Sequence, residues 1–218
     1  CASGGGRVDY GSLPYHDEFW TSDNTDALQR VYMQYATNLI YPPVATASHV
    51  SASPGHQTGS ITPLKFRFDV AMSGRLGLEL QPKDIPAEEM AFAREAIANY
   101  KTHVRELVTK GDLYRLISPY ECTNNHAANL LVRKDKSKAV LFAYCTGFNR
   151  RGIRPTVHLH GLDASKRYRI TEINKAGKRK AFWGEGHIYD GTYLQQVGIE
   201  LQIARQYDSA VFLLEEVK

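Results

Sequence analysis

Residues 1–27 of the chain read CASGGGRVDYGSLPYHDEFWTSDNTDA. This stretch combines a glycine-rich turn at residues 4–6, the aromatic pair Phe19 and Trp20, and a run of polar residues at 21–26. Carboxyl groups can move a proton at a glycosidic oxygen, an indole face can stack on a sugar ring, and glycines let the backbone approach hydroxyl groups closely. The stretch therefore indicates a sugar-binding site.

A helix is predicted directly after this stretch. Asn24, Thr25 and Asp26 provide oxygens for its N-cap and negative charge for its first turn. The apolar residues that recur at helical spacing are Leu28, Val31, Tyr32, Tyr35 and Leu39. Asp23 then lies at a strand-to-helix junction, where barrel enzymes carry catalytic groups. From spacing alone, a helix cap and a catalytic carboxylate explain Asp23 equally well.

Two segments of the opening stretch carry a family resemblance. Residues 1–7 (CASGGGR) and 20–27 (WTSDNTDA) resemble the signature of glycoside hydrolase family 36, the microbial α-galactosidases. The likeness continues at residues 41–43 (YPP), 49–51 (HVS) and 68–72 (FDVAM), and more weakly to the end of the chain. It implies a retaining hydrolase of terminal α-linked galactose, with its site on a (β/α)8 barrel and an α-galactoside oligosaccharide of the raffinose or melibiose type as substrate.

The resemblance also implies roles for individual residues. Asp23 would be the catalytic general acid/base, and Asp26 would keep a structural role. The substrate-binding residues would be Cys1, Ala2, Ser3, Gly4 and Trp20. The nucleophile of the family is an Asp in a Lys-Trp-Asp motif, which these residues do not contain. We therefore expect the C-terminal part of a longer enzyme, inactive without its missing N-terminal part.

Some polar residues remain open to two interpretations. His49 and His56 lie in predicted loops, where they could face a pocket or solvent. Members of the family carry Asn and Arg around the positions of Gly55 and Ser60, so the contribution of this loop to substrate choice is open. Asp9, Asp17 and Asp69 are further carboxylates, but none lies in a matching motif.

The composition bounds the class of protein. A chain of 218 residues with 43% hydrophobic and 23% charged residues is typical of a soluble globular protein of one large or two small domains. The net charge of +4, from 27 basic and 23 acidic residues, does not favour nucleic acid as a partner, and the basic runs at 133–138 and 175–180 indicate hairpin ends. We also expect a cytoplasmic protein that needs no cofactor, and assembly as a homo-oligomer stays open.

Cysteines and apolar runs add little. Three cysteines do not suggest a disulfide framework, and no apolar run approaches the roughly twenty residues of a membrane span. A chain that opens with Cys1 and glycines would also fit a lipidated lipoprotein, but that interpretation leaves residues 20–26 unexplained.

The first 111 residues alternate predicted strands and helices. Strands are expected up to Trp20, at 44–47 (followed by a polar loop at 48–51) and at 76–80; helices are expected from 28, at 64–72 and from 86 to a stop at Gly111. This alternation predicts parallel β/α units, about half of a barrel. Because parallel strands need both faces covered and both edges paired, the half should be unstable or associate without the missing half.

After Gly111 the pattern changes to short strands separated by turns. These predicted strands are 113–117, 128–133, 139–144, 156–160, 168–173, 193–197 and 210–214. They favour an antiparallel sandwich or barrel. The predicted fold is thus α/β plus all-β: the C-terminal half of a (β/α)8 TIM barrel in residues 1–111, then an antiparallel β-sandwich in 112–218. His158 and His160 share one side of a strand, but no third ligand is spaced to complete a metal site.

Two other classes of function stay open. One is a carbohydrate-binding or structural β-sandwich module that folds alone. The other is a related enzyme that acts on α-N-acetylgalactosamine or transfers galactosyl groups to another sugar. The residues that would separate these enzyme specificities are expected upstream of this chain.

Overall fold

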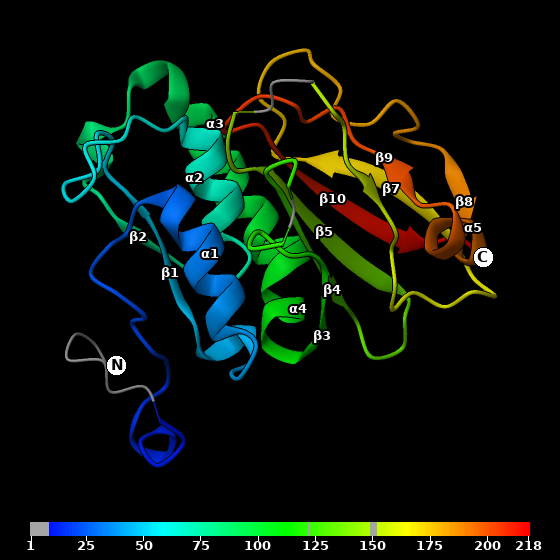
Figure 1. The fold of residues 1–218 in the computed structure, drawn as a ribbon, viewed down its shortest axis with the longest axis horizontal. Helices are drawn as coiled ribbons and strands as arrows, with labels where there is room; N and C mark the ends of the chain where they lie inside the picture. Colours follow the sequence, from blue (N-terminus) through cyan, green and yellow to red (C-terminus); the bar gives the residue numbers. More distant parts are fainter. Residues whose placement is uncertain (1–8, 122, 149–151) are drawn as a thin grey trace.

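The computed structural model describes residues 9–121, 123–148 and 152–218, and Figure 1 shows the course of the chain. Helices around two short parallel strands come first, followed by a six-stranded antiparallel sheet. The helices and strands of the first part are α1 (Ala27–Thr37), β1 (Ala47–Ser51), α2 (Leu64–Ala71), β2 (Arg75–Glu79), α3 (Ala87–Asn99) and α4 (Arg105–Lys110), with short 3-10 turns at Leu13–Tyr15, Pro43–Ala45 and Pro82–Asp84. Those of the second part are β3 (Asp112–Ile117), β4 (His126–Val132), β5 (Lys138–Cys145), β6 (Thr156–Val157), β7 (Arg167–Ile173), β8 (Ile188–Asp190), α5 (Gly191–Gln196), β9 (Ile199–Glu200) and β10 (Ser209–Glu216).

The predicted helices are present, but α1 buries a different face from the one expected. Its buried residues are Ala27, Arg30, Val31 and Gln34, whereas Leu39 lies beyond the helix and is exposed. The helix that begins after Pro86 runs through a π-helical turn at Tyr100–Val104 into α4. It ends at Gly111, where a Cβ atom would lie 2.6 Å from the carbonyl oxygen of Leu107.

The parallel strands confirm the predicted β/α alternation, with two corrections. β1 and β2 pair in parallel from Ala47–Arg75 to Ser51–Glu79, and Phe19 forms a parallel bridge to Thr46. The strand predicted at 44–47 is wrong, because residues 43–45 form a 3-10 turn and the strand occupies the predicted polar loop. β1 is buried on both faces apart from the half-buried His49. Ser51 donates its hydroxyl to the carbonyl of Thr25 at 2.9 Å, whereas the buried hydroxyl of Ser48 has no hydrogen-bond partner among the described residues. The strand expected up to Trp20 is reduced to the single bridge of Phe19.

The second part confirms most of the predicted strands. Its main sheet has the order β3-β4-β5-β10-β7-β8, and all neighbours are antiparallel. The strand predicted at 193–197 is wrong, because this segment lies mostly in helix α5. Its apolar residues Tyr193, Leu194 and Val197 fit a helical turn as well as a strand. The strand predicted at 156–160 is limited to two residues, and the short strands β8 and β9 were not predicted.

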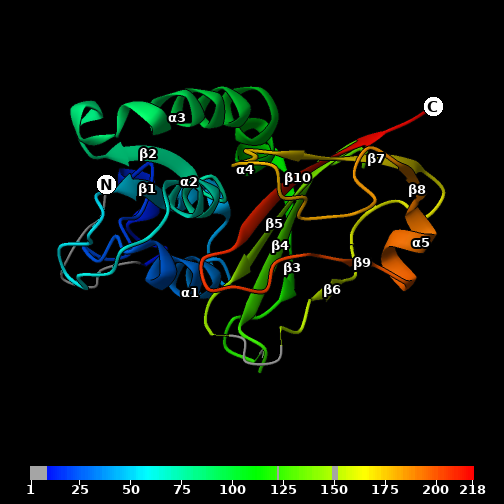
Figure 2. The ribbon, with the colours of Figure 1, turned by 90° about the horizontal axis from the view of Figure 1, so that it is seen from above.

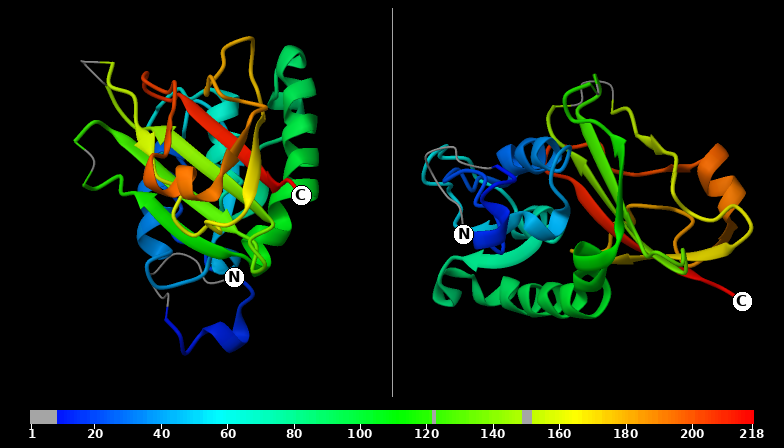
Figure 3. Two further views of the ribbon diagram at one scale, coloured as in Figure 1. Left: turned by 90° about the vertical axis from the view of Figure 1, so that its right-hand side faces the viewer. Right: turned by 90° about the horizontal axis from the view of Figure 1, so that it is seen from below.

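The main sheet is covered on both faces (Figure 2). One face packs against β6, β9 and α5, in a core that includes Leu141, Leu194 and Phe212. This arrangement is consistent with the predicted C-terminal β-sandwich. The other face packs against α1, α2 and α4, in a core that includes Phe66, Leu107 and Phe142. Figure 3 shows the helices beside the sheet from two further directions. The helical layer and the sheet therefore share a core.

A buried acidic residue also joins the two layers. Asp69 of α2 is fully buried and accepts hydrogen bonds from Lys65 (2.5 Å), Ser209 of β10 (2.7 Å) and Asn174 after β7 (3.1 Å). We call these four residues the Asp69 seam. Among the described residues, no helix is long and apolar enough to cross a membrane.

Candidate functional site

The candidate site lies where the parallel segments end. Trp20 and Asp23 follow the bridge of Phe19, β1 ends at Ser51, and β2 ends at Glu79. Because parallel segments point the same way, their carboxyl ends meet at one edge of the sheet, which is where open α/β sheets and barrels bind ligands. The sequence stretch that indicated a sugar site thus leads to the edge where such a site is expected.

A buried arginine organises the loop that carries Asp23. Arg30 of α1 is only 2% exposed. Its guanidinium donates to the carbonyl oxygens of Asn24 (2.9 Å) and Ser22 (2.6 Å) and to the hydroxyl of Thr21 (2.5 Å). All three acceptors lie within residues 21–24, so one side chain fixes the backbone on both sides of Asp23. Buried charges need this degree of hydrogen bonding to be tolerated.

Two carboxylates lie near Arg30, one at the end of β2 and one in the segment after Phe19. Burial lowers the pKa of Arg30, whereas the nearby carboxylates of Glu79 and Asp23 raise it. Asp23 itself is exposed, and no other described residue forms a hydrogen bond or an ion pair with its carboxylate. It is therefore free to meet a ligand. The N-cap of α1 is Asp26 and not Asp23, which removes capping as the explanation of Asp23.

Aromatic rings form one wall beside Arg30. The Trp20 and His49 ring centroids are 4.2 Å apart, and the Arg30 Cζ atom lies 5.4 Å from the Trp20 centroid, within cation–π range. His49 lies against Gly77 of β2, where a Cβ atom would be only 2.3 Å from the His49 Cδ2 atom. Burial lowers the pKa of His49, which favours a neutral ring, while Glu79 opposes the shift. His49 thus faces the site, whereas His56 is exposed on a loop.

Asp26 has a structural role, as expected. Its carboxylate accepts from the backbone N–H of Gln29 (3.0 Å), which caps α1, and from the hydroxyls of Thr58 (2.9 Å) and Ser60. Burial raises the pKa of Asp26, but these hydrogen bonds outweigh it and hold the pKa below its ordinary value. The loop at 53–62 is therefore attached directly to the start of α1.

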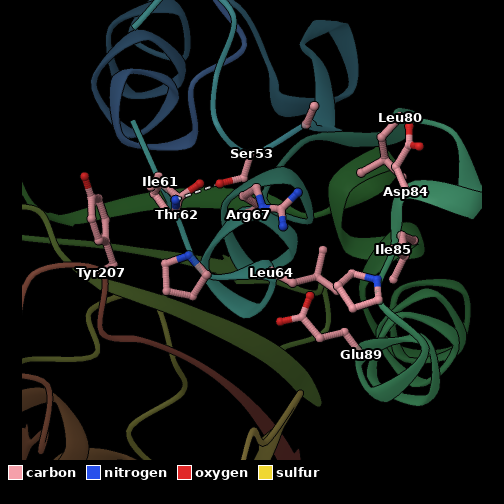
Figure 4. A pocket seen from close by; sticks show the side chains of 13 residues that line it. Ser53, Ile61, Thr62, Leu64, Arg67, Leu80, Asp84, Ile85, Glu89 and Tyr207 are labelled. Carbon is pink, nitrogen blue, oxygen red and sulfur yellow. Dashed lines mark hydrogen bonds between the residues drawn. The ribbon is translucent and has the colours of Figure 1, made fainter. Parts of the chain in front are cut away.

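A cavity of about 490 Å³ lies on the α2 side of this loop (Figure 4). Its polar lining includes Thr62, Arg67, Asp84 and Glu89, from the loop, α2 and the connection into α3. The volume is in the range of small-molecule sites, which are mostly apolar with a few polar groups. Within residues 9–121, 123–148 and 152–218, no three His, Cys, Asp or Glu side chains are grouped so that they could hold a metal ion.

The structure brings together some of the predicted residues and adds others. Trp20 and Asp23 lie in one assembly around Arg30, whereas Cys1, Ala2, Ser3 and Gly4 lie outside the described residues. Arg30 and Glu79 were not predicted. The signal for Arg30 was present in α1, because a charged residue on the face shared by Ala27 and Val31 needs polar partners.

The three further acidic residues have separate surroundings. Asp9 accepts from the N–H of Ser12 in a local turn, Asp17 is exposed, and Asp69 belongs to the seam between α2 and the sheet. The rings of His158 and His160 stack with centroids 6.1 Å apart. Both residues belong to the second part of the chain, whereas the site is formed by strand ends of the first part.

Comparisons with known proteins identify the family of the chain. The melibiase family model matches residues 1–111, and the model of the glycosyl hydrolase family 36 C-terminal domain matches residues 126–214. Alpha-galactosidase 2 of Hypocrea jecorina is 40% identical over 217 residues, which cover 99% of this chain and 27% of that protein. Alpha-galactosidase AgaA of Geobacillus stearothermophilus is 38% identical over 201 residues, which cover 92% of this chain and 25% of AgaA.

Solved structures give the same result. The alpha-galactosidase of Lactobacillus brevis has a TM-score of 0.87 and 30% identity, over 100% of this chain and 28% of that one. A variant of Geobacillus AgaA in complex with 1-deoxygalactonojirimycin has a TM-score of 0.86 and 38% identity, over 98% of this chain and 28% of that one. The chain spans about 27% of the length of curated relatives such as the Hypocrea enzyme. From its family-model matches and its relatives, the chain belongs to the melibiase family, glycoside hydrolase family 36.

Proposed function

We propose that the chain is the C-terminal part of a retaining α-galactosidase that removes terminal α-linked galactose from oligosaccharides such as raffinose. The observation that carries this proposal is Asp23, an exposed carboxylate held beside Trp20 by the buried Arg30 at the ends of parallel segments. The relatives support it, since structures of AgaA variants are described in complex with raffinose and with stachyose.

In this proposal Asp23 is the general acid/base of a two-step reaction. Retaining glycosidases place two carboxyl groups about 5 Å apart across the scissile bond. The nucleophile, which we place upstream of this chain, attacks the anomeric carbon while Asp23 gives its proton to the departing glycosidic oxygen. Asp23 then takes a proton from water, whose oxygen displaces the nucleophile and releases galactose. Trp20 and residues 1–4 would bind the galactose.

The proposal includes a barrel that is completed by upstream sequence. The outer edge of β2 pairs with no strand among the described residues. A groove of about 560 Å³ follows this strand, with Leu76 and Leu78 in its lining, and Leu78 is 43% exposed. An unpaired strand edge with apolar neighbours is suited to another strand. We therefore assign residues 1–111 to the C-terminal part of a (β/α)8 barrel.

The decisive experiment replaces Asp23 in the full-length enzyme that carries this chain. Asp23→Ala should lower the turnover of raffinose by about 10²–10⁴-fold, the usual contribution of general acid–base catalysis. Hydrolysis of p-nitrophenyl α-galactoside should fall less in its first step, because p-nitrophenolate leaves without a proton. An unchanged rate on raffinose would remove Asp23 from the mechanism.

Exposed aromatic residues of the second part favour one other function. Trp183 is 68% exposed, and the rings of Tyr189 and Tyr193 stack with centroids 5.6 Å apart. Such rings suit a carbohydrate-binding module. That function would be supported if galactose binding survived Asp23→Ala but was lost in Trp183→Ala.

A further inference from the structure

The loop at 53–62 is a compact unit that connects β1 to α2. It closes on itself through hydrogen bonds from the N–H of Gly55 to the carbonyl of Ser60 (2.9 Å) and from the N–H of Gly59 to the carbonyl of Gly55 (2.7 Å). At its base, the N–H of Thr62 donates to the hydroxyl of Ser53 at 3.0 Å, as the dashed line in Figure 4 shows. Because these bonds lie within the loop, we expect it to move as one piece.

Asp26 attaches this unit to the site. Its Oδ2 atom accepts from the hydroxyls of both Thr58 and Ser60. Gly55 lies directly over the same carboxylate, since a Cβ atom there would be 3.6 Å from Oδ2. No other side-chain hydrogen bond links the loop, in the part of the chain that the structure describes, to residues outside it. We call Asp26, Thr58 and Ser60 the Asp26 clasp.

The clasp couples the loop to the segment that carries Asp23. Asp26 lies three residues after Asp23, and its second carboxylate oxygen, Oδ1, accepts from the backbone N–H of Gln29 and caps α1. Asp26 is only 7% exposed, so its two oxygens must find donors inside the protein. One carboxylate therefore links the loop to the start of the helix that follows Asp23. His56 and Gln57 are exposed on the loop and present polar groups to solvent.

We infer that Asp26 is a positioning residue for the leaving-group side of the substrate, and that the loop it holds contacts the sugars beyond the scissile bond. This inference rests on the proposed function. A general acid meets the glycosidic oxygen from the side of the leaving group. The loop is bonded to Asp26, three residues after Asp23 in the chain. We therefore expect it to border the path along which the glucose and fructose units of raffinose extend, whereas an aryl galactoside is too short to need it.

Two sets of substitutions in the full-length enzyme separate the clasp from the helix cap. Asp26→Ser keeps an N-cap oxygen for α1, because Ser caps as well as Asp, but its short side chain cannot hold the loop. Thr58→Val with Ser60→Ala leaves Asp26 and the cap intact and removes the loop donors. The matched control is Thr192→Val with Ser137→Ala, which removes hydroxyl hydrogen bonds to Ala164 and Asp135 far along the chain from the site.

Both test variants should raise the KM for raffinose and stachyose by roughly five- to tenfold, the scale of a lost hydrogen-bonded contact, with kcat changed less. The KM for p-nitrophenyl α-galactoside should stay within about twofold, as should all values of the control. Thermal unfolding of each variant shows that it is folded.

Three results would overturn the inference. Unchanged KM values for raffinose would do so, and so would an equal rise for raffinose and the aryl galactoside, which would indicate a merely structural role. In both of these cases an active wild type leaves the proposed function standing. A folded wild-type enzyme that hydrolyses neither substrate would overturn the proposed function and, with it, the inference.

Discussion

The molecule contains two buried polar assemblies that use the same chemistry differently. The Asp69 seam joins α2 to the sheet, and its carboxylate is surrounded by donors from Lys65, Asn174 and Ser209. In the assembly around Arg30, the buried guanidinium is hydrogen-bonded to the backbone of residues 22 and 24, whereas the carboxylate of Asp23 is exposed. A polar group that is fully bonded stabilises a fold, whereas one held in place but left unbonded is available for a ligand.

The largest expected effect on stability tests the seam. In the full-length enzyme that carries this chain, Asp69→Ala should lower the free energy of unfolding by about 3–5 kcal/mol, because it leaves Lys65 and Asn174 without their buried partner. Urea unfolding followed by circular dichroism measures this loss. The matched control is Asp23→Ala, which should stay within about 0.5 kcal/mol because Asp23 is exposed. Equal losses in the two variants would contradict the distinction between the assemblies.

A smaller effect is expected where the site packs most tightly. Gly77→Ala should destabilise the chain by about 1–3 kcal/mol, because the new Cβ atom collides with the ring of His49. The collision should also displace His49 from Trp20 and change the tryptophan fluorescence. Adding His49→Ala should recover part of the loss, and strictly additive losses would show that the two residues do not interact.

The smallest effect concerns pH. Burial lowers the pKa of His49 in the folded state, so the unfolded chain binds a proton more readily. The contribution of His49 to the free energy of unfolding is therefore fully present above the ordinary histidine pKa of about 6.5, and it is lost as the pH falls below that value. The half-buried His103 and the buried His126 also have pKa values lowered by desolvation, so they act in the same direction.

His49→Gln should therefore weaken, but not abolish, the loss of stability between pH 7 and pH 5. The comparison is between urea midpoints of the wild type and the variant at each pH. A variant whose pH dependence equals that of the wild type would show that His49 titrates normally in the folded chain.

The sequence predicted the elements better than their boundaries. The apolar pattern identified α2, the helix from Pro86 to Gly111 and five strands of the main sheet, because these elements are rich in buried apolar residues. It missed β1, since Ser48, His49 and Ser51 have the composition of a loop, and the two serines are buried only through tertiary contacts. It also assigned 193–197 to a strand, because short apolar runs fit a helix equally well.

The candidate site was predicted in part. Trp20 and Asp23 came from a motif contiguous in sequence, and the structure brings them together around Arg30. Glu79 could not be found in this way, because it comes near Arg30 only through the parallel pairing of β1 and β2. The clasp of Asp26 with Thr58 and Ser60 likewise joins residues more than thirty positions apart.

The shared core between the helical layer and the sheet constrains how the enzyme can be recombined. Phe142 and Val211 of the sheet pack in one cluster with Phe66 and Leu107 of the helices. A chimaera that exchanges only residues 112–218 with a relative would join two surfaces that were not selected together. A stable chimaera should require that the residues of α2 and α4 that face the sheet are exchanged together with the sheet. The segment that must be exchanged as one piece is therefore larger than residues 112–218.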